Sequence, residues 1–197
     1  MIRRCTEKDF KAMFKVINDA AEAYNGVIPE DCWKDPYLLK SELRIEIDSG
    51  VIFWGYEKKG ELLGVMGIQH VIDVSLIRHA YVRTAHQNQG IGRKLTKHIM
   101  NQTKRTLLVG TWAAATWAIR FYEKNGFTLV MPKEEKDRLL KRYWKISPRQ
   151  IETSVVLQKP ARGESLETKA EGQEAGEGQR EFTIDASGPV GPTARRE

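Results

Sequence analysis

Hydrophobic positions along the 197-residue chain follow two alternating patterns. In one, apolar side chains recur every three or four residues, which is typical of an amphipathic helix; in the other they form short runs or alternate with polar residues, as strands do. The helical pattern predicts helices over residues 7–23, 36–49, 91–104, 116–125 and 134–144. The strand pattern predicts strands over residues 2–4, 51–57, 61–71, 73–82, 106–112, 127–130 and 149–157. This order predicts an α/β fold, with a mixed sheet of about seven strands flanked by helices.

Local signals mark where three of these helices begin or end. Thr6 is a candidate N-cap of the first helix, with Asp9 at the position that completes a capping box. Asp35 followed by Pro36 predicts the start of the second helix, because proline is favoured at the first helical position. Gly126 follows the predicted helix at 116–125, where a glycine commonly ends a helix.

The composition of the chain changes at Pro160. Residues 160–197 are rich in Gly, Glu, Ala, Ser and Thr and contain one aromatic residue, Phe182. Such a segment buries too little apolar surface to offset the entropy that it loses on ordering. The sequence therefore predicts one folded domain over residues 1–159 and a disordered, acidic, Gly- and Glu-rich tail over residues 160–197.

The predicted domain is basic. Residues 1–159 hold 27 Lys and Arg against 18 Asp and Glu, a net charge of +9, whereas residues 160–197 hold 5 against 8, a net charge of −3. A basic domain attracts anions such as phosphates, nucleic acids and acidic small molecules. No zinc-ligand spacing, RNA-binding signature or recognition-helix pattern accompanies the charge, so nucleic-acid binding is not expected.

Three further features bear on location. No run of about 18 apolar residues is present, so no membrane span is expected. The N-terminus turns polar at once and lacks the apolar core of a signal peptide. The two cysteines, Cys5 and Cys32, fit a reducing compartment better than a disulfide framework. We therefore expect a cytoplasmic protein without a membrane partner.

The stretch QNQGIG, Gln87–Gly92, places two glycines between a predicted strand and a predicted helix. A dinucleotide fingerprint would need a third glycine where Leu95 stands and an acidic residue about 20 positions further on, and both are missing. A Walker loop is also absent. A third interpretation is a strand–turn–helix whose backbone N–H groups bind a pyrophosphate, with glycines allowing the ligand to approach closely.

The chain around this turn has no acidic residue between Val74 and Tyr122. The same window holds a set of basic residues, namely Arg78, Arg83, Arg93, Lys94, Lys97, Lys104, Arg105 and Arg120. A long basic stretch around a helix N-terminus attracts anions. The alternative is that the glycines only end a strand and the basic residues solvate helix surfaces.

Two segments resemble the motifs of a known family. QNQGIG matches the Q/R-x-x-G-x-G/A signature of the GNAT superfamily of N-acyltransferases, and AIRFYEKNGF, Ala118–Phe127, resembles the second motif of that family. The two segments occur in the family's order and are separated by one predicted strand. The resemblance covers roughly residues 1–158, and the two motifs at this spacing are more specific than either alone.

The resemblance implies an N-acetyltransferase that uses acetyl-CoA as co-substrate and no metal. It implies a sheet in which two parallel strands splay apart, with the pantetheine beside Val82. It also implies that a primary amine attacks the thioester directly and that Tyr122 protonates the departing CoA thiolate. The pyrophosphate would be bound by the turn, that is by Gln87, Asn88, Gln89, Gly90, Ile91, Gly92 and Arg93. The alternative is a non-catalytic acyl-CoA-binding or sensing module, which would not need Tyr122.

The sequence departs from the family at two positions. Ala115 stands where members often have an asparagine that contacts the cofactor, and the strand before the turn carries no carboxylate as general base. His79 has a suitable ordinary pKa of about 6.5. Regular strand alternation predicts His79 on the same side as Ile77 and Tyr81, opposite Arg78, which is itself a candidate contact for a substrate carboxylate.

The sequence does not identify the acceptor amine. In this family the loop between the first two helices walls the acceptor site, and here that loop offers Glu30, Asp31 and Trp33 as candidate contacts. Glu30, Asp31, Asp73 and a chain of waters are further candidates for the general base. The predicted helix at 134–144 is a candidate lid, or else a solvated charged surface. A small-molecule amine, a protein amine and a homodimer all stay open.

Overall fold

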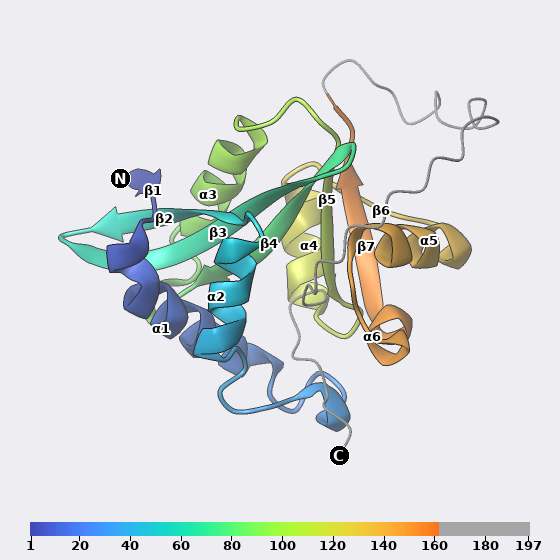
Figure 1. Ribbon diagram of the computed structural model, residues 1–197, viewed down its shortest axis with the longest axis horizontal. Helices are drawn as coiled ribbons and strands as arrows, with labels where there is room; N and C mark the ends of the chain where they lie inside the picture. Colours follow the sequence, from blue (N-terminus) through green and yellow to red (C-terminus); the bar gives the residue numbers. More distant parts are fainter. Residues whose placement is uncertain (162–197) are drawn as a thin grey trace.

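Figure 1 shows the computed structural model, in which residues 1–161 are described. The predicted disordered tail at 160–197 lies, apart from its first two residues, outside the described residues. Within residues 1–161 the chain forms one twisted sheet of seven strands in the order β1-β2-β3-β4-β5-β7-β6. The strands are β1 (Ile2–Arg4), β2 (Ile52–Lys58), β3 (Glu61–Val71), β4 (Val74–Val82), β5 (Leu107–Trp112), β6 (Thr128–Leu129) and β7 (Ser154–Lys159). The predicted mixed α/β sheet of about seven strands is confirmed.

The pairing of the strands is antiparallel except at one place near the centre of the described sheet. β4 and β5 run parallel, joined by the crossover through α3. Along β5 every residue from Leu107 to Trp112 pairs with β7 on the other side. A parallel pair needs a long crossover connection, and here that connection contains the glycine turn.

Helices cover both faces of the sheet (Figure 1). They are α1 (Phe10–Ala21), α2 (Lys40–Asp48), α3 (Ile91–Met100), α4 (Thr116–Lys124), α5 (Lys133–Tyr143) and α6 (Pro148–Thr153). Short 3-10 turns add η1 (Glu7–Asp9), η2 (Glu22–Tyr24), η3 (Glu30–Cys32) and η4 (Thr84–His86). The apolar residues of α1 and α2 pack on one face, together with α5, and those of α3 and α4 pack on the other. Alternate residues of the central strands face the two layers, as with Leu76 and Ile77.

The start of the first helical segment confirms the predicted capping box. The backbone N–H of Thr6 donates to Asp9 Oδ2 at 2.8 Å, and the Thr6 hydroxyl donates to the same oxygen at 3.1 Å. Arg3 on β1 also contacts this carboxylate, with Nη2 2.8 Å from Asp9 Oδ1. The side-chain hydrogen bond from Arg3 holds the pKa of Asp9 well below its usual range. The cap therefore ties α1 to the first strand as well as starting the helix.

The second helix begins at Lys40, four residues after the predicted start at Pro36. Tyr37 and Leu38 are buried in the core instead of entering the helix. Asn18 on α1 holds this extended segment, because its side-chain oxygen accepts the Leu38 N–H at 2.9 Å and its amide donates to Leu38 O at 3.1 Å. A side chain 20 positions away thus overrides the local Asp–Pro signal.

The last predicted strand, at 149–157, is wrong over its first half. Residues 148–153 form α6, and β7 begins only at Ser154. Ser147 caps the helix, since its Oγ accepts the N–H of Gln150 at 3.2 Å, and Pro148 occupies the first helical position. The alternation of Ile151 and Thr153 with polar residues is typical of a strand. The Ser–Pro signal at 147–148, however, is typical of a helix start, and the helix forms.

Candidate functional site

A cavity of about 920 Å³ opens where β4 and β5 separate. The two strands pair only at Ser75–Leu107, Leu76–Leu108 and Ile77–Val109, and no further pairs follow. Beyond that point the cavity is lined by the ends of both strands, by α3 and α4, and by the end of α1. The predicted splay of a parallel strand pair is therefore present within the described chain.

An extra residue in β4 makes the strands diverge. Gly67 on β3 pairs with Arg78 while Val65 pairs with Tyr81, so two residues on β4, His79 and Ala80, face one residue on β3, Met66. His79 has a positive φ of 48°, which marks this β-bulge. A Cβ on Gly67 would lie 3.1 Å from Arg78 O, so only glycine fits opposite the bulge without a shift.

The bulge corrects the predicted side-chain alternation of β4. Arg78 and His79 both reach Glu46 of α2, and Tyr81 packs beside Tyr24 of η2, so these three β4 side chains share the face covered by α1 and α2. The sequence analysis placed Arg78 opposite the other two. A strict period of two fails at a bulge because one extra residue inverts every later position.

The glycine turn leads directly into α3. Asn88 and Gly90 have positive φ values of 60° and 75°, and Gly90 is the N-cap of the helix. The N–H of Lys94 donates to Gly90 O at 3.0 Å, closing the first helical turn. The N–H groups of Ile91, Gly92 and Arg93 precede that bond and lie at the positive end of the helix dipole. This arrangement suits an anion.

Gly92 also sets the distance between α3 and α4. A Cβ at this position would lie 3.2 and 3.3 Å from two ring atoms of Phe121 and 3.8 Å from Val82 Cγ2. Phe121 on α4 and Val82 on β4 both line the cavity. The missing side chain thus lets the two helices meet across the wall of the cavity.

Most residues predicted to bind the cofactor line this cavity. They are Val82, Gln87, Asn88, Gly90, Ile91, Gly92 and Arg93. Gln89 is not among the lining residues, and its side-chain amide donates to Ala85 O at 3.4 Å. Gln87 Nε2 donates to Val82 O at 3.3 Å, which fastens the turn to the end of β4.

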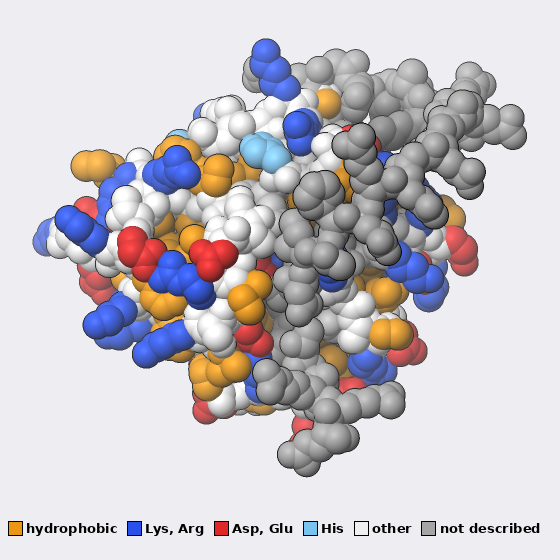
Figure 2. Space-filling model, viewed as in Figure 1, with side chains coloured by type: hydrophobic (Ala, Val, Ile, Leu, Met, Phe, Trp, Pro, Cys, Tyr) orange, Lys and Arg blue, Asp and Glu red, His pale blue; other side chains and the backbone are white. Residues whose placement is uncertain are grey.

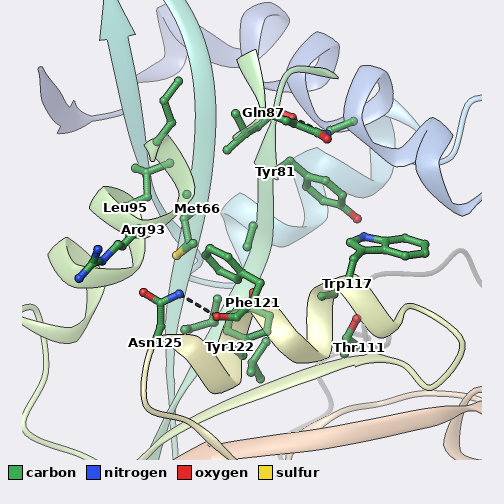
Figure 3. A pocket seen from close by; sticks show the side chains of 18 of the residues that line it. Met66, Tyr81, Gln87, Arg93, Leu95, Thr111, Trp117, Phe121, Tyr122 and Asn125 are labelled. Carbon is green, nitrogen blue, oxygen red and sulfur yellow. Dashed lines mark hydrogen bonds between the residues drawn. The ribbon is translucent and has the colours of Figure 1, made fainter. Parts of the chain in front are cut away.

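Tyr122 lines the same cavity from α4 (Figure 3). Its side chain is buried, with ring centroids 5.1 Å from Phe121 and 5.5 Å from Phe127. Burial is the main cause that raises the pKa of the Tyr122 phenol far above its ordinary value. The phenol is therefore protonated at neutral pH and able to donate a proton.

A buried group of charges lies behind the bulge. Glu46 Oε1 accepts a hydrogen bond from Arg78 Nη2 at 2.6 Å, and Glu46 Oε2 lies 3.4 Å from His79 Nε2. All three side chains are at most 3% exposed. Burial alone would raise the pKa of Glu46, but the charge of Arg78 and the neighbouring His79 lower it, so the carboxylate stays ionised. Of the three residues, His79 lines the cavity.

The sequence analysis missed Glu46. Its signal was a glutamate on the apolar face of a predicted helix, three residues after Leu43 and seven after Leu39. A carboxylate at such a position is seldom fully buried unless it is paired. It therefore predicts a buried partner, which the structure identifies as the pair on β4.

The other candidate acceptor contacts lie outside the cavity lining. Asp31 pairs with Arg149, with 3.1 Å between Oδ2 and Nε, and Trp33 packs on Tyr37 with ring centroids 5.6 Å apart. Glu30 is likewise not a lining residue. Arg78 is not either, because it is directed to Glu46.

The helix predicted as a candidate lid does not border the cavity. Leu139, Leu140 and Tyr143 of α5 are buried against Leu76 of β4 and Val156 of β7. The charged residues of α5 form ion pairs along the helix, such as Lys133 with Asp137 at 2.5 Å. This segment is part of the core on the face shared with α1 and α2.

Charge is distributed unevenly around the molecule. The face seen in Figure 2 carries Lys and Arg side chains interspersed with Asp and Glu. Two of the ion pairs of α2 are Arg44 with Glu7 and Lys34 with Glu42. The cavity lining differs, because among the described residues it contains Arg93 and Lys124 but no Asp or Glu.

The described residues contain neither a cluster of metal-ligating side chains nor a membrane-spanning helix. No group of three or more His, Cys, Asp or Glu side chains within residues 1–161 is placed to hold a metal ion. In the same part of the chain, every helix is too short or too polar to cross a membrane.

Comparison with known proteins agrees with the motifs and the fold. The profile of the acetyltransferase (GNAT) domain family matches residues 49–129, which run from the end of α2 to β6. This stretch contains the splayed strands, the glycine turn and Tyr122. Residues 49–129 of this chain are therefore similar to the acetyltransferase (GNAT) domain.

One curated relative is an L-methionine sulfoximine/L-methionine sulfone acetyltransferase from Salmonella typhimurium strain LT2. It is 27% identical over 97 residues, which is 47% of this chain and 54% of the relative. The matched segment thus spans about half the length of that relative.

Solved structures share the fold at low identity. An acetyltransferase of the GNAT family from Staphylococcus aureus Mu50 has a TM-score of 0.60 at 19% identity, with coverage of 81% of this chain and 97% of that chain. The PaiA N-acetyltransferase from Thermoplasma acidophilum, solved in complex with coenzyme A, has a TM-score of 0.58 at 15% identity, with coverage of 81% and 98%.

Proposed function

We propose that this protein transfers an acetyl group from acetyl-CoA to a primary amine. The observation that carries the proposal is a single cavity bordered by the N-terminus of α3, by the Tyr122 phenol and by His79. These three features supply an anion site, a proton donor and a proton acceptor. Their position at the split between β4 and β5 supports direct transfer between two substrates that enter the same space.

The described residues fit an acyl-CoA. The diphosphate would be bound by backbone N–H groups between Asn88 and Arg93, where positive φ values and the absence of a Cβ at Gly92 leave the backbone accessible. Arg93 and Lys124 line the cavity and add positive charge. The pantetheine would lie beside Val82, in the gap where β4 has lost its β5 partner.

Tyr122 is the proposed proton donor. Bound acetyl-CoA supplies a thioester, and transfer of its acetyl group to a neutral amine forms an amide bond and releases a thiolate. The Tyr122 phenol is protonated at neutral pH, because burial raises its pKa, and it would give its proton to the sulfur as negative charge develops there. The amine loses one proton in the same overall reaction, so the enzyme needs a proton acceptor as well.

His79 is the proposed proton acceptor. Its imidazole lines the cavity, and its Nε2 lies 3.4 Å from the Glu46 carboxylate. An ionised Glu46 would stabilise the imidazolium that forms when His79 takes a proton from the amine. Arg78 on the other carboxylate oxygen keeps Glu46 ionised. Glu46 would act as a positioning residue through His79.

The alternative is a non-catalytic acyl-CoA-binding module. Such a protein would need the glycine turn but neither Tyr122 nor the Glu46–His79 pair. All of these groups border one cavity or contact a residue that does, which favours the enzyme. The Salmonella relative, by its name, acetylates small amino-acid analogues, which supports a small-molecule amine over a protein amine as acceptor.

An amine-library screen tests the proposal. The full chain is incubated with acetyl-CoA and single amines, and both the acetylated product and the free thiol are measured. We expect kcat of Tyr122→Phe to fall about 100-fold, the scale of a lost general acid, with the KM for acetyl-CoA nearly unchanged. Tyr56→Phe is the matched control, because that ring lies outside the cavity lining, near Lys94.

Two results would contradict the proposal. Undiminished turnover by Tyr122→Phe at every pH would remove Tyr122 from the chemistry. Binding of acetyl-CoA without acetylation of any amine would favour the non-catalytic alternative.

A further inference from the structure

The end of the cavity away from the glycine turn is walled by aromatic side chains. Tyr24 of η2 and Trp117 of α4 pack with ring centroids 5.8 Å apart, and Tyr81 meets Tyr24 edge-on at 6.4 Å. Figure 3 shows Trp117 and Tyr81 on one side of the cavity and Arg93 on the other. Trp117 is 43% exposed, whereas Tyr24 and Tyr81 are buried. A half-exposed indole at the edge of a cavity is a surface that a flat apolar group would cover.

The lining contains no negative charge. Among the described residues that border the cavity there is no Asp or Glu, and the ionisable nitrogen groups are Arg93, Lys124, His79 and His86. Two acidic residues on neighbouring elements, Asp19 and Glu46, already have interaction partners. Asp19 of α1 accepts the N–H of Thr84 at 2.7 Å, and Glu46 pairs with Arg78.

We propose that the acceptor is a primary amine on a flat apolar or aromatic body that carries no second positive charge. This inference rests on the proposed acetyl transfer and names its substrate class. The apolar body would lie against Trp117 and Tyr24, and the amine would extend toward His79 and the thioester. An arylalkylamine has this chemistry.

A diamine or polyamine fits the cavity poorly. Its second ammonium would be desolvated at the aromatic end of the cavity, where the described lining offers no carboxylate to compensate, and such burial is unfavourable. Aromatic rings attract one cation through their faces. In this cavity that attraction would act on the reacting amine as it enters. The Trp117–Tyr24 pair carries no negative charge that could balance a second ammonium.

A matched pair of amines tests the inference. Benzylamine and p-xylylenediamine share one ring and one aminomethyl group, and the second compound adds a second aminomethyl group, which carries the extra positive charge. We expect kcat/KM for benzylamine to exceed that for p-xylylenediamine at least about tenfold, because the extra charge lacks a partner. Tryptamine and spermidine extend the comparison to a larger ring and to an aliphatic polyamine.

Two variants locate the effect in the cavity. Trp117→Ala should lower kcat/KM for tryptamine about tenfold while the KM for acetyl-CoA changes little, and Trp117→Phe should restore most of the loss. Ala23→Glu would place a carboxylate on the lining next to Tyr24, and should improve the use of p-xylylenediamine relative to benzylamine about fivefold. Ala23→Gln is the uncharged control and should leave that ratio unchanged.

The outcomes separate the inference from the proposed function. Acetylation of p-xylylenediamine or spermidine with a kcat/KM above that of the monoamines would overturn the acceptor class and leave acetyl transfer intact. Acetylation of none of the four amines, together with none in the wider library, would overturn the proposed function itself.

Discussion

The two halves of the β4–β5 pair have opposite roles. In the closed half, residues 75–77 and 107–109, the strands are hydrogen-bonded and leucine, isoleucine and valine pack on both faces. In the open half, residues 78–82 and 110–112, the strands part and His79, Tyr81 and Thr111 border a cavity. The same two strands thus supply a packed core at one end and part of the cavity wall at the other.

The boundary between the halves is the bulge at His79. Its extra residue ends the regular alternation, and Glu46 of α2 contacts both His79 and the preceding residue, Arg78. The strands of the open half therefore do not separate because their side chains pack weakly. It is held open by a buried ion pair on one face and by aromatic packing around Tyr81.

The largest effect is expected from the ion pair at the boundary. Glu46→Gln would leave the Arg78 charge buried without its carboxylate, and such a change typically costs about 3–5 kcal/mol of unfolding free energy. Urea unfolding of the wild type and the variant measures the difference. The double variant Glu46→Leu, Arg78→Met should recover much of the loss, because no charge is then buried. A loss below about 1 kcal/mol for Glu46→Gln would show that the pair does not hold the bulge.

Substitutions in the closed half should lower stability without changing the binding of acetyl-CoA. Leu108→Ala deletes a fully buried side chain between β4 and β7 and should cost about 3 kcal/mol, while the KM for acetyl-CoA stays unchanged. Thr111→Ala in the open half removes a hydroxyl from the cavity lining and should cost about 1 kcal/mol. A Leu108→Ala variant that lost acetyl-CoA binding while remaining folded would contradict the division into two halves.

In the open half, a substitution at Gly92 should weaken the binding of acetyl-CoA. The added methyl of Gly92→Ala would press on Phe121 at 3.2 Å and crowd the diphosphate position, so acetyl-CoA affinity should fall about tenfold. Gly90→Ala is the control, because a Cβ there meets nothing within 4 Å although its φ is +75°. We expect Gly90→Ala to cost about 1 kcal/mol of stability. Calorimetric titration with acetyl-CoA distinguishes the two, and equal losses of affinity would count against the crowding argument.

The smallest effect concerns acid stability. The pKa of Glu46 is lowered in the folded protein, since the charges and hydrogen bonds of Arg78 and His79 together outweigh the effect of burial. A carboxyl with a lowered folded-state pKa stabilises the fold above its ordinary value of 4.5, and that contribution is lost as the pH falls below it. Unfolding free energies measured from pH 7 to pH 3 should therefore fall less steeply for Glu46→Gln than for the wild type. If the unfolding free energies of the two proteins fell in parallel with pH, the lowered pKa of Glu46 would be refuted.

Much of this fold could be predicted from the sequence. Hydrophobic periodicity indicated the sheet and five of its flanking helices, and the glycine turn with its acid-free surroundings indicated the anion site. One failure occurred where a distant residue overrides the local pattern, because Asn18 delays the start of α2. In the other, two local signals compete: Ser147 and Pro148 start a helix within a segment whose alternation is typical of a strand.

The candidate site was predicted only in part. Its backbone elements lie in one continuous stretch, so the turn and Tyr122 could be found by motif. The partner of His79 could not, because Glu46 comes from another helix and a β-bulge has no dependable sequence signature. Trp117 was likewise missed, since an aromatic residue on a helix usually packs in a core.

The central claim is that backbone N–H groups between residues 88 and 93 bind the diphosphate of acetyl-CoA beside the split strands. Calorimetric titration of the full chain with acetyl-CoA and with acetyl-pantetheine, which lacks the diphosphate, tests it directly. We expect acetyl-CoA to bind with one-to-one stoichiometry. Its affinity should be at least about 100 times higher than that of acetyl-pantetheine, which is the scale of several charge-assisted hydrogen bonds. Equal affinity for the two compounds, or no heat with acetyl-CoA, would contradict it.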